Sequence, residues 1–177
     1  MKIYLITDTH FNHKKVIEFC NRPKNYEQLL FSSMSNIPEN GVLLHLGDIC
    51  IGKDVEVHEK YIKPLRCKKW LVRGNHDRKS YSWYYEHGWD LVTDGMVLQI
   101  GGKQVLLTHT PRPIGTFDLN IHGHFHNSTH RMEDPGKTAR YKLEDVGAKH
   151  KLLAVEYTHY KPVEAHSFVN EGLKNIE

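Results

Sequence analysis

The sequence has few cysteines, no long apolar run and little net charge, and each shortage argues against a class of protein. Its three cysteines are odd in number and form no C-x-x-C pair, which speaks against a disulfide framework and a thiolate metal site. No apolar stretch is long enough for a signal peptide or a membrane span. We therefore expect a cytoplasmic protein with no membrane partner.

The charge balance is nearly even. Lys and Arg number 24 against 21 Asp and Glu, a net charge of +3, which permits an anionic substrate without requiring nucleic acid. A length of 177 residues with 39% hydrophobic residues fits one globular domain with its own core. We expect a single domain over residues 1–177, and these numbers leave its oligomeric state open.

Histidine is the residue in excess, at 14 of 177 residues, and its side chain is both a common metal ligand and a near-neutral acid or base. Many of these histidines follow short apolar runs. Strands are predicted over residues 2–6, 42–46, 69–73, 104–108 and 119–122, and each ends in a polar cluster. In an α/β fold such clusters lie beyond the carboxyl ends of the strands, so five distant segments can converge.

Helices are predicted between the first strands. Asn25 and Gln28 resemble a capping box, so a helix should begin there and stop before Pro38. Two further helical stretches are expected over residues 14–20 and 54–62.

The second half of the chain should contain a hairpin, because a Gly-Gly dipeptide suited to a tight turn separates residues 96–100 from residues 104–108. Residues 127–150 are polar and irregular, which predicts an exposed excursion of unassigned role. A strand over residues 152–157 and a helix after Pro162 should follow it.

The first two clusters carry side chains that suit divalent cations. Asp8 and His10 are two residues apart on a loop, so both can face one side and bind one cation. Asp48 follows a glycine at a tight turn, and its two oxygens can bridge two cations. His45, inside the preceding strand, either supports this loop by a hydrogen bond or lies satisfied in the core, and we favour the second.

The later clusters supply an amide and more imidazoles. The Asn75 amide oxygen can bind a cation while the neighbouring His76 stays free to donate a proton. His109 ends one strand, and His124 and His126 alternate after the next. Each of these signals alone is often only a turn or a buried polar residue, but their order along one chain is much more specific.

Taken in order, D-x-H, G-D, G-N-H-D, a strand-end histidine and G-H-x-H resemble the calcineurin-like metallophosphoesterase superfamily, over residues 8–126. D-T-H-F-N-H at residues 8–13, C-N-R-P at residues 20–23 and H-L-G-D at residues 45–48 are further similar to small, poorly characterised bacterial and phage members. The resemblance implies an α/β fold, a four-layer α/β/β/α sandwich of two mixed sheets.

The resemblance also implies a site with two metal ions. One would be surrounded by Asp8, His10, Asp48 and His126, and the other by Asp48, Asn75, His109 and His124. Asp48 would bridge them. His76 is similar to the histidine that stabilises the transition state or protonates the leaving oxygen, and Asp77 is expected to orient it.

The predicted cofactors are two divalent metal ions. Imidazole, carboxylate and amide ligands without thiolate favour Mn, Fe, Ni or Zn, and the resemblance favours Mn. Such a pair lowers the pKa of a shared water and neutralises a phosphate during in-line attack. Guanidinium and imidazole groups suit substrate phosphate, and the candidates, each with a structural or solvated role as an equal alternative, are His13, Arg22, Arg73 and Arg112.

The function that follows is hydrolysis of a phosphodiester or phosphomonoester, with nucleotides or nucleic-acid ends among the substrates. A metal-dependent nuclease is one alternative, but the cations of the late excursion are offset by nearby acids. The cations are Arg131, Lys137, Arg140, Lys142 and Lys149, and the acids are Glu133, Asp134, Glu144 and Asp145. A non-enzymatic interaction module is the other alternative, and the complete ligand set argues against it.

Overall fold

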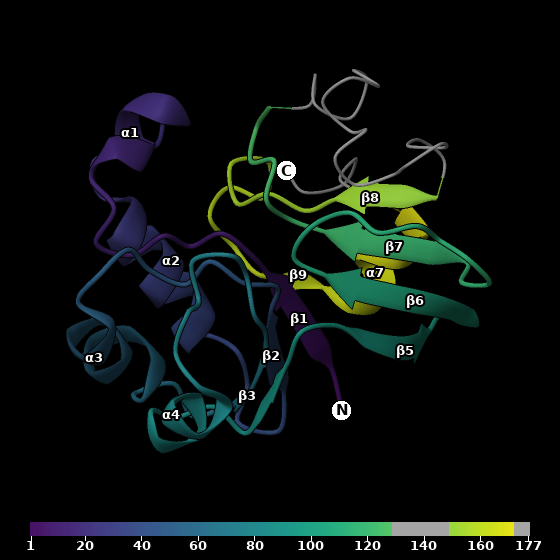
Figure 1. Ribbon diagram of the computed structural model, residues 1–177, viewed down its shortest axis with the longest axis horizontal. Coiled ribbons are helices and arrows are strands. Elements are labelled where there is room, and N and C mark those ends of the chain that lie inside the picture. Colours follow the sequence, from purple (N-terminus) through teal and green to yellow (C-terminus); the bar gives the residue numbers. More distant parts are fainter. Residues whose placement is uncertain (129–148, 172–177) are drawn as a thin grey trace.

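The computed structural model describes residues 1–128 and 149–171, which form two β-sheets and several short helices (Figure 1). The strand order is β4-β3-β2-β1-β9 in the first sheet and β5-β6-β7-β8 in the second. The first sheet comprises β1 (Ile3–Ile6), β2 (Val42–His45), β3 (Lys68–Val72), β4 (Leu91–Thr93) and β9 (Val163–Glu164). The second comprises β5 (Met96–Ile100), β6 (Lys103–Thr108), β7 (Leu119–His122) and β8 (His150–Leu152).

Both sheets are mixed. Strands β1 to β4 run parallel, with β9 antiparallel beside β1. Strands β6, β7 and β8 run parallel, with β5 antiparallel beside β6. The expected α/β fold with two mixed sheets is therefore confirmed. Within each sheet, the loops that carry the predicted ligands leave from the same edge, at the carboxyl ends of parallel strands.

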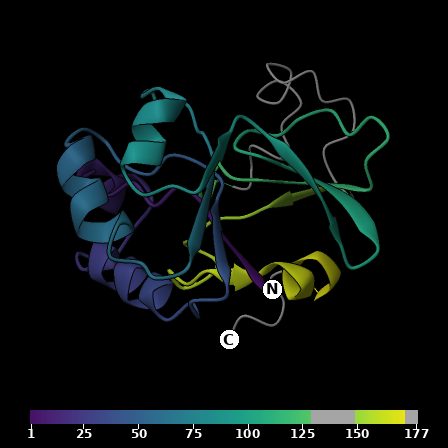
Figure 2. The same ribbon diagram turned by 90° about the horizontal axis from the view of Figure 1, so that it is seen from below.

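The first sheet is buried on both faces, which explains its nearly continuous apolar strands. Ile6 and Leu43 pack in a core with the helices, whereas Leu5 and Leu44 pack in a second core with the other sheet. Figure 2 shows the helices on one side of the first sheet and the second sheet on the other. These helices are α1 (Lys15–Phe19), α2 (Tyr26–Ser35), α3 (Asp54–Val57) and α4 (Tyr81–Glu86).

The C-terminal helix α7 (Ala165–Glu171) joins the core between the sheets through Phe168 and Val169. It contacts β1, β9 and β5, so it lies where the two sheets meet. The predicted hairpin is also confirmed. Gly101 and Gly102, with φ of 57° and 79°, make the turn between β5 and β6.

Two predicted details are wrong. The Asn25 side chain makes no capping hydrogen bond, and its carbonyl instead accepts the N–H groups of Gln28 and Leu29 at 3.0 and 3.1 Å. The strand expected over residues 152–157 ends at Leu152, because the following backbone turns on itself through hydrogen bonds to the Ala154 carbonyl at 3.0 and 3.2 Å.

Two other predictions are refined or lie outside the structure. The helix expected over residues 54–62 is α3 followed by a π-helical turn, η1 (His58–Ile62), closed by the Lys63 N–H on the His58 carbonyl at 2.8 Å. The exposed excursion predicted for residues 127–150 falls mainly on residues 129–148, which lie outside the described part.

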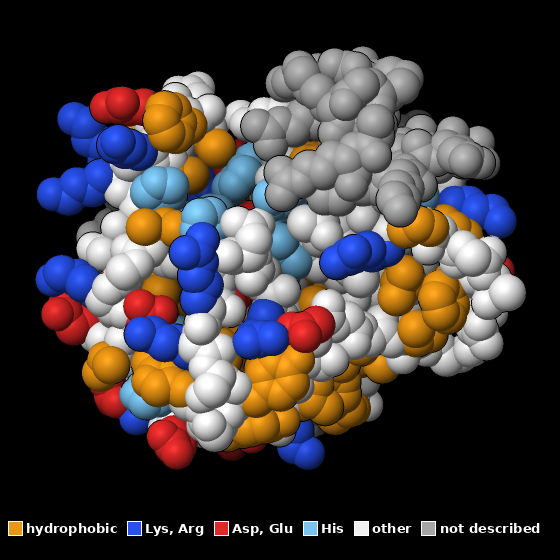
Figure 3. All heavy atoms as spheres, in the orientation of Figure 1, with side chains coloured by type: hydrophobic (Ala, Val, Ile, Leu, Met, Phe, Trp, Pro, Cys, Tyr) orange, Lys and Arg blue, Asp and Glu red, His pale blue; other side chains and the backbone are white. Residues whose placement is uncertain are grey.

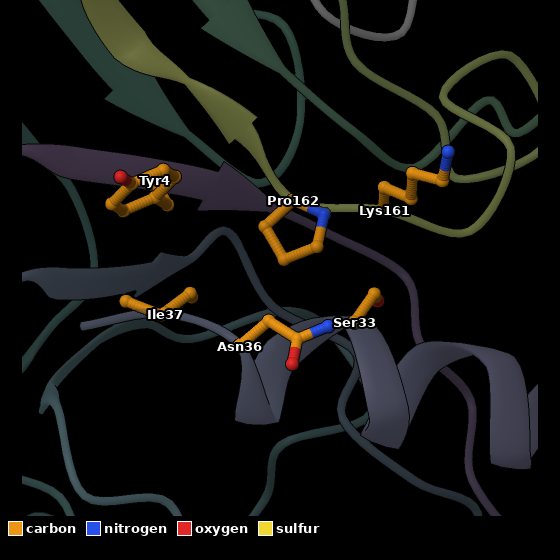
Figure 4. A pocket seen from close by; sticks show the side chains of 6 residues that line it. All are labelled: Tyr4, Ser33, Asn36, Ile37, Lys161 and Pro162. Atoms are coloured by element: carbon orange, nitrogen blue, oxygen red, sulfur yellow. The ribbon is translucent and has the colours of Figure 1, made fainter.

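All three cysteines are buried and free, as expected for a chain without a disulfide framework. Among the described residues, no helix has the length and apolar character needed to cross a membrane. A cavity of about 250 Å³ lies between α2, β1 and the segment before β9 (Figure 4). It contains none of the predicted ligands, and its lining residues are Tyr4, Ser33, Asn36, Ile37, Lys161 and Pro162.

Candidate metal centre

The loops after β1 and β2 run side by side beyond the ends of the strands. The Asp8 N–H donates to the Gly47 carbonyl at 2.9 Å, and the His10 N–H donates to the Asp48 carbonyl at 3.1 Å. Parallel pairing thus continues from the sheet into the loops. This continuation holds three predicted ligands, Asp8, His10 and Asp48, at fixed positions relative to one another.

The ligand loops adopt a backbone conformation that most residues avoid. Left-handed φ angles occur at five of the predicted ligands: 50° at Asp8, 48° at His10, 59° at Asp48, 71° at His124 and 51° at His126. Asp and His enter this region more readily than most residues, but it still carries strain that the surrounding structure must hold. Left-handed backbone therefore occurs at Asp48, the predicted bridging ligand, and at four of the other six predicted ligands.

Glycines let these loops approach closely. A Cβ atom added to Gly47 would lie 2.6 Å from the Gly74 Cα and 2.9 Å from the His109 Nδ1. A Cβ atom on Gly123 would collide with side-chain oxygens of Thr7 and Asp8. The glycines of the motifs are therefore required by contact between backbones and ligands, in addition to any turn that they form.

The first cluster consists of Asp8, His10 and His126, whose ligand atoms all lie within 4.8 Å of one another. The Nε2 atoms of both histidines lie 3.7 Å from Asp8 Oδ1. That oxygen is buried without a hydrogen-bond partner, whereas Oδ2 accepts from Thr7 Oγ1 and the His124 N–H at 2.6 and 2.9 Å. A buried oxygen without a donor, facing two imidazole nitrogens, fits a cation.

The second cluster consists of Asp48, His109 and His124, again within 4.8 Å. The His109 Nε2 lies 3.3 Å from Asp48 Oδ2, 3.1 Å from Asn75 Oδ1 and 3.2 Å from His124 Nδ1. The same Asp48 oxygen lies 3.7 Å from the Nε2 of His10 in the first cluster. All seven predicted ligands thus converge, with Asp48 between the two groups.

The far nitrogens of two histidines have partners that aim the near nitrogens inward. The His109 Nδ1 donates to the Leu46 carbonyl at 2.8 Å, which leaves Nε2 facing Asp48. The His126 Nδ1 lies 3.3 Å from Glu156 Oε1, which leaves Nε2 facing Asp8. Such outer partners fix the orientation of metal-binding histidines.

Glu156 is a site residue that the sequence analysis missed. It lies in the turn region after β8, in no motif, so no local signal marks it. Its Oε1 accepts from the Arg22 Nε and NH2 at 2.8 and 2.7 Å. Arg22 also donates to the carbonyls of Asp8 and Thr9 at 2.8 and 2.9 Å. Arg22, which the sequence analysis predicted to contact substrate, is only 3% exposed. It lies behind the ligand loops and holds them in place.

His45 is buried and makes two hydrogen bonds that join the first two loops. Its Nδ1 accepts from the Gly47 N–H at 3.0 Å, and its Nε2 donates to Thr9 Oγ1 at 2.9 Å. The Thr9 hydroxyl in turn donates to the Ile49 carbonyl at 3.0 Å. Burial lowers the pKa of His45 to about 3, so the ring is neutral and both nitrogens are used. His45 is thus satisfied in the core and also supports the loop of Asp48.

Carboxylates and imidazoles at the site shift one another's pKa values. Burial alone would lower the pKa of His109, but the carboxylates of Asp8 and Asp48 raise it to about 9. Burial likewise opposes protonation of His126, but contacts with Cys20, Glu156 and Asp8 raise its pKa to about 10. Burial disfavours ionised Asp8 as well, yet the neighbouring histidines hold the pKa of that carboxyl low. The protons on His109 and His126 therefore place positive charge at positions that would also suit a bound cation.

The two predicted catalytic residues differ in their surroundings. The His76 side chain is 40% exposed, and its Nε2 lies 3.9 Å from Asp48 Oδ2. Asp77 is buried and accepts backbone hydrogen bonds from Asp48, Gly74 and Ile49 at 2.7, 2.8 and 3.1 Å. These contacts tie together the β2 and β3 loops. The structure gives no contact between the Asp77 carboxylate and the His76 ring, so the expected orienting role of Asp77 has no support.

The other predicted substrate contacts are not all brought to the site. The His13 ring lies 5.3 Å from the His10 ring, at the edge of the first cluster. Arg73 is held by Asp94, with Nε and NH2 at 2.9 and 2.7 Å from Oδ1. Arg112 is exposed in the loop after β6 and does not line the cavity at the metal centre.

A cavity of about 310 Å³ opens onto both clusters, and in Figure 3 histidine side chains gather at the surface of this face. A profile described as calcineurin-like phosphoesterase matches residues 1–173. The chain belongs to that family. Membership makes this phosphoesterase a metal-dependent hydrolase of phosphate esters, and its Asp and His clusters are suited to hold the metal.

Similar proteins come from several organisms. An uncharacterized protein of Methanocaldococcus jannaschii is 30% identical over 171 residues, covering 92% of this chain and 86% of that protein. A protein of unknown function from Aquifex aeolicus shares the fold, with a TM-score of 0.70, 24% identity and coverage of 95% and 97%. An archaeal phosphodiesterase has a TM-score of only 0.43 and 18% identity over 70% of this chain and 73% of its own. That last likeness is too remote to bear on function here.

Proposed function

We propose that this phosphoesterase hydrolyses phosphodiesters with two divalent cations, one held by each cluster. The observation that carries the proposal is the position of Asp48 Oδ2, which lies 3.7 Å from His10 Nε2 and 3.3 Å from His109 Nε2. One carboxylate oxygen thus faces imidazoles of both clusters, as a bridging ligand must. Mn is the first candidate metal, and Fe, Ni and Zn suit the same nitrogen and oxygen donors.

Two cations bound there would activate water for attack and neutralise charge on the phosphate oxygens. The chain's own part is to position the proton donor. The His76 backbone is anchored by its N–H on Asp48 Oδ1 at 2.9 Å, while its ring extends into the cavity. An exposed imidazole beside the clusters can hydrogen-bond an ester oxygen and protonate it as the bond breaks.

The opposing possibility, an interaction module without activity, is disfavoured by the same geometry. Four of the ligand residues line one cavity together with His76, and the other three, Asp8, Asn75 and His109, lie against them. A surface used only for binding needs no buried Asp8 oxygen without a donor. Phosphomonoesters, nucleotides and nucleic-acid ends share the reacting group with a simple diester. The nuclease is therefore a special case of the proposal, and the assay must include such a substrate.

Activity is tested with purified protein and Mn against bis(p-nitrophenyl) phosphate, p-nitrophenyl phosphate, 2′,3′-cyclic nucleotides and single-stranded DNA. We expect turnover of the diester that EDTA abolishes and Mn restores. His76→Ala should lower kcat by about 10²- to 10⁴-fold while Mn still binds. His166→Ala, which removes an exposed histidine of α7, is the matched control. No metal-dependent turnover of any substrate would overturn the proposal.

The bridging role of Asp48 has its own test. Asp48→Asn removes the negative charge that two neighbouring cations require between them, so we expect loss of the second equivalent of Mn together with activity. Calorimetric titration with Mn measures the stoichiometry. Asp118→Asn, a neutral substitution of an exposed aspartate in the loop before β7, should leave the stoichiometry at two. A variant Asp48→Asn that still binds two Mn would contradict a bridging carboxylate.

A further inference from the structure

A second cavity adjoins the metal centre at His76. It measures about 340 Å³, within the range of small-molecule sites, and His76 lines both this cavity and the one at the clusters. Arg78 and Lys79 line it from the segment after β3, and Gly52 and Asp54 line it from the segment after β2. A substrate bound at the clusters can therefore extend past His76 into this second space.

The two cations of this cavity are available to a ligand. Arg78 and Lys79 are exposed, and neither forms an ion pair within residues 1–128 and 149–171. The Arg78 Nε makes one long hydrogen bond, 3.4 Å to the Asn75 carbonyl. The Lys79 Nζ lies 5.7 Å from the centre of the Trp83 ring. Both therefore differ from Arg73, whose charge is balanced by a carboxylate.

The segment that carries these cations is held at both ends. Before Arg78, the buried carboxylate of Asp77 accepts three backbone hydrogen bonds from the loops of β2 and β3. After Arg78, the Arg73 guanidinium donates to the Lys79 carbonyl at 3.1 Å, and Ser80 caps α4. A fixed backbone limits the ordering that ligand binding requires. Arg73 thus fixes the backbone of Lys79.

We propose that Arg78 and Lys79 form a subsite for a second phosphate, so the preferred substrate is a phosphodiester that carries another phosphate, bound beyond His76. This inference rests on the proposed phosphodiesterase function. Guanidinium and ammonium groups are suited to phosphate oxygens. Among the described residues, Asp54 is the one carboxylate that lines the cavity, against two cations, so a positive excess remains. In Figure 3, Lys and Arg side chains lie beside the histidines of this face.

The test compares substrates that differ only in the second phosphate. p-Nitrophenyl phosphate esters of thymidine, at the 5′ or the 3′ position, are prepared with and without a phosphate on the other position. The value of kcat/KM with Mn is measured for each. We expect at least one pair to show about a tenfold preference for the doubly phosphorylated ester, the size of one charge-assisted contact. Rising salt should reduce that preference.

Variants decide whether the two cations cause the preference. Arg78→Gln with Lys79→Gln should bring the ratio of the paired kcat/KM values close to one. The control, Arg66→Gln with Lys68→Gln, also removes one Arg and one Lys, but at the amino end of β3, away from the cavity. It should leave the ratio unchanged. Equal rates within both wild-type pairs, or a preference that survives Arg78→Gln with Lys79→Gln, would overturn the subsite. If the protein cleaves none of the four esters and does not cleave bis(p-nitrophenyl) phosphate either, the proposed function itself is refuted.

Discussion

At the scale of single residues, the metal centre depends on which nitrogen each histidine presents. The Leu46 carbonyl holds the Nδ1 proton of His109, and Glu156 accepts from the corresponding nitrogen of His126. The Leu46 partner belongs to the backbone and survives any side-chain change. The Glu156 partner is a side chain, buried with Arg22, so its contribution can be measured by substitution.

Glu156→Gln tests this contribution. The substitution keeps the shape of the side chain but removes the charge that polarises the His126 ring, so we expect Mn affinity to fall about 10- to 100-fold. Calorimetric titration measures the affinity, and thermal unfolding of the metal-free protein shows whether the variant still folds. Glu18→Gln, on the exposed face of α1, is the matched control. A folded Glu156→Gln variant with wild-type affinity would show that Glu156 only pairs with Arg22.

At the scale of elements, the site is built where loops touch rather than where strands pair. The β2 loop meets the β3 loop at Gly47 and Gly74, and the β7 loop meets the β1 loop at Gly123. These contacts bring ligands from both sheets to one point. Because both partners in the first contact are backbone, neither can yield as a flexible side chain would.

Comparing Gly47→Ala with Gly102→Ala distinguishes the cost of the Gly47–Gly74 backbone contact from the cost of a positive φ angle alone. Both glycines have positive φ, 96° and 79°, but a Cβ atom on Gly102 would meet nothing within 4 Å. We expect Gly102→Ala to lower the free energy of unfolding by about 1–2 kcal/mol. Gly47→Ala should cost about 3 kcal/mol or more, because backbone must move, and should also abolish Mn binding. Urea unfolding and Mn titration measure both, and equal costs would contradict the contact argument.

At the scale of the whole molecule, three buried histidines outside the ligand set link stability to pH. Burial lowers the pKa of His45 to about 3, of His58 to about 4 and of His122 to about 3. Unfolding returns each pKa to about 6.5. Between pH 6.5 and about 4 the unfolded chain therefore binds protons that the folded chain excludes, so stability falls as pH falls.

Urea unfolding of the metal-free protein at pH 7.5 and pH 5.0 measures this effect. We expect a loss of about 2 kcal/mol per buried histidine over that interval. His58 lies in η1, outside the ligand loops, and His58→Phe should reduce the loss by about 2 kcal/mol, the contribution of one histidine. His166→Phe, at an exposed position of α7, should leave it unchanged. The raised pKa values of His109 and His126 oppose this loss above pH 6.5, so the deciding result is the comparison of variants. A loss that His58→Phe leaves unchanged would contradict the linkage.

The sequence by itself determined which residues could bind metal and where the strands that present them end. Apolar runs and the polar clusters after them are local signals, so the sequence alone predicts Asp8, Asp48 and His109 at strand ends. The hairpin at Gly101 was equally local. The capping box at Asn25 was also a local signal but failed, because a side chain suited to capping need not turn toward the helix.

Only the tertiary structure decided the supporting residues. Glu156 lies 134 residues from Arg22 and 30 residues from His126, so no spacing in the sequence relates the three. Asp77 stands next to His76 in the chain, yet its carboxylate binds the backbone of the β2 loop instead. The physical reason is the same for both. A ligand's type follows from its own chemistry, whereas a partner's role depends on which distant group the packing of two sheets brings within hydrogen-bonding distance.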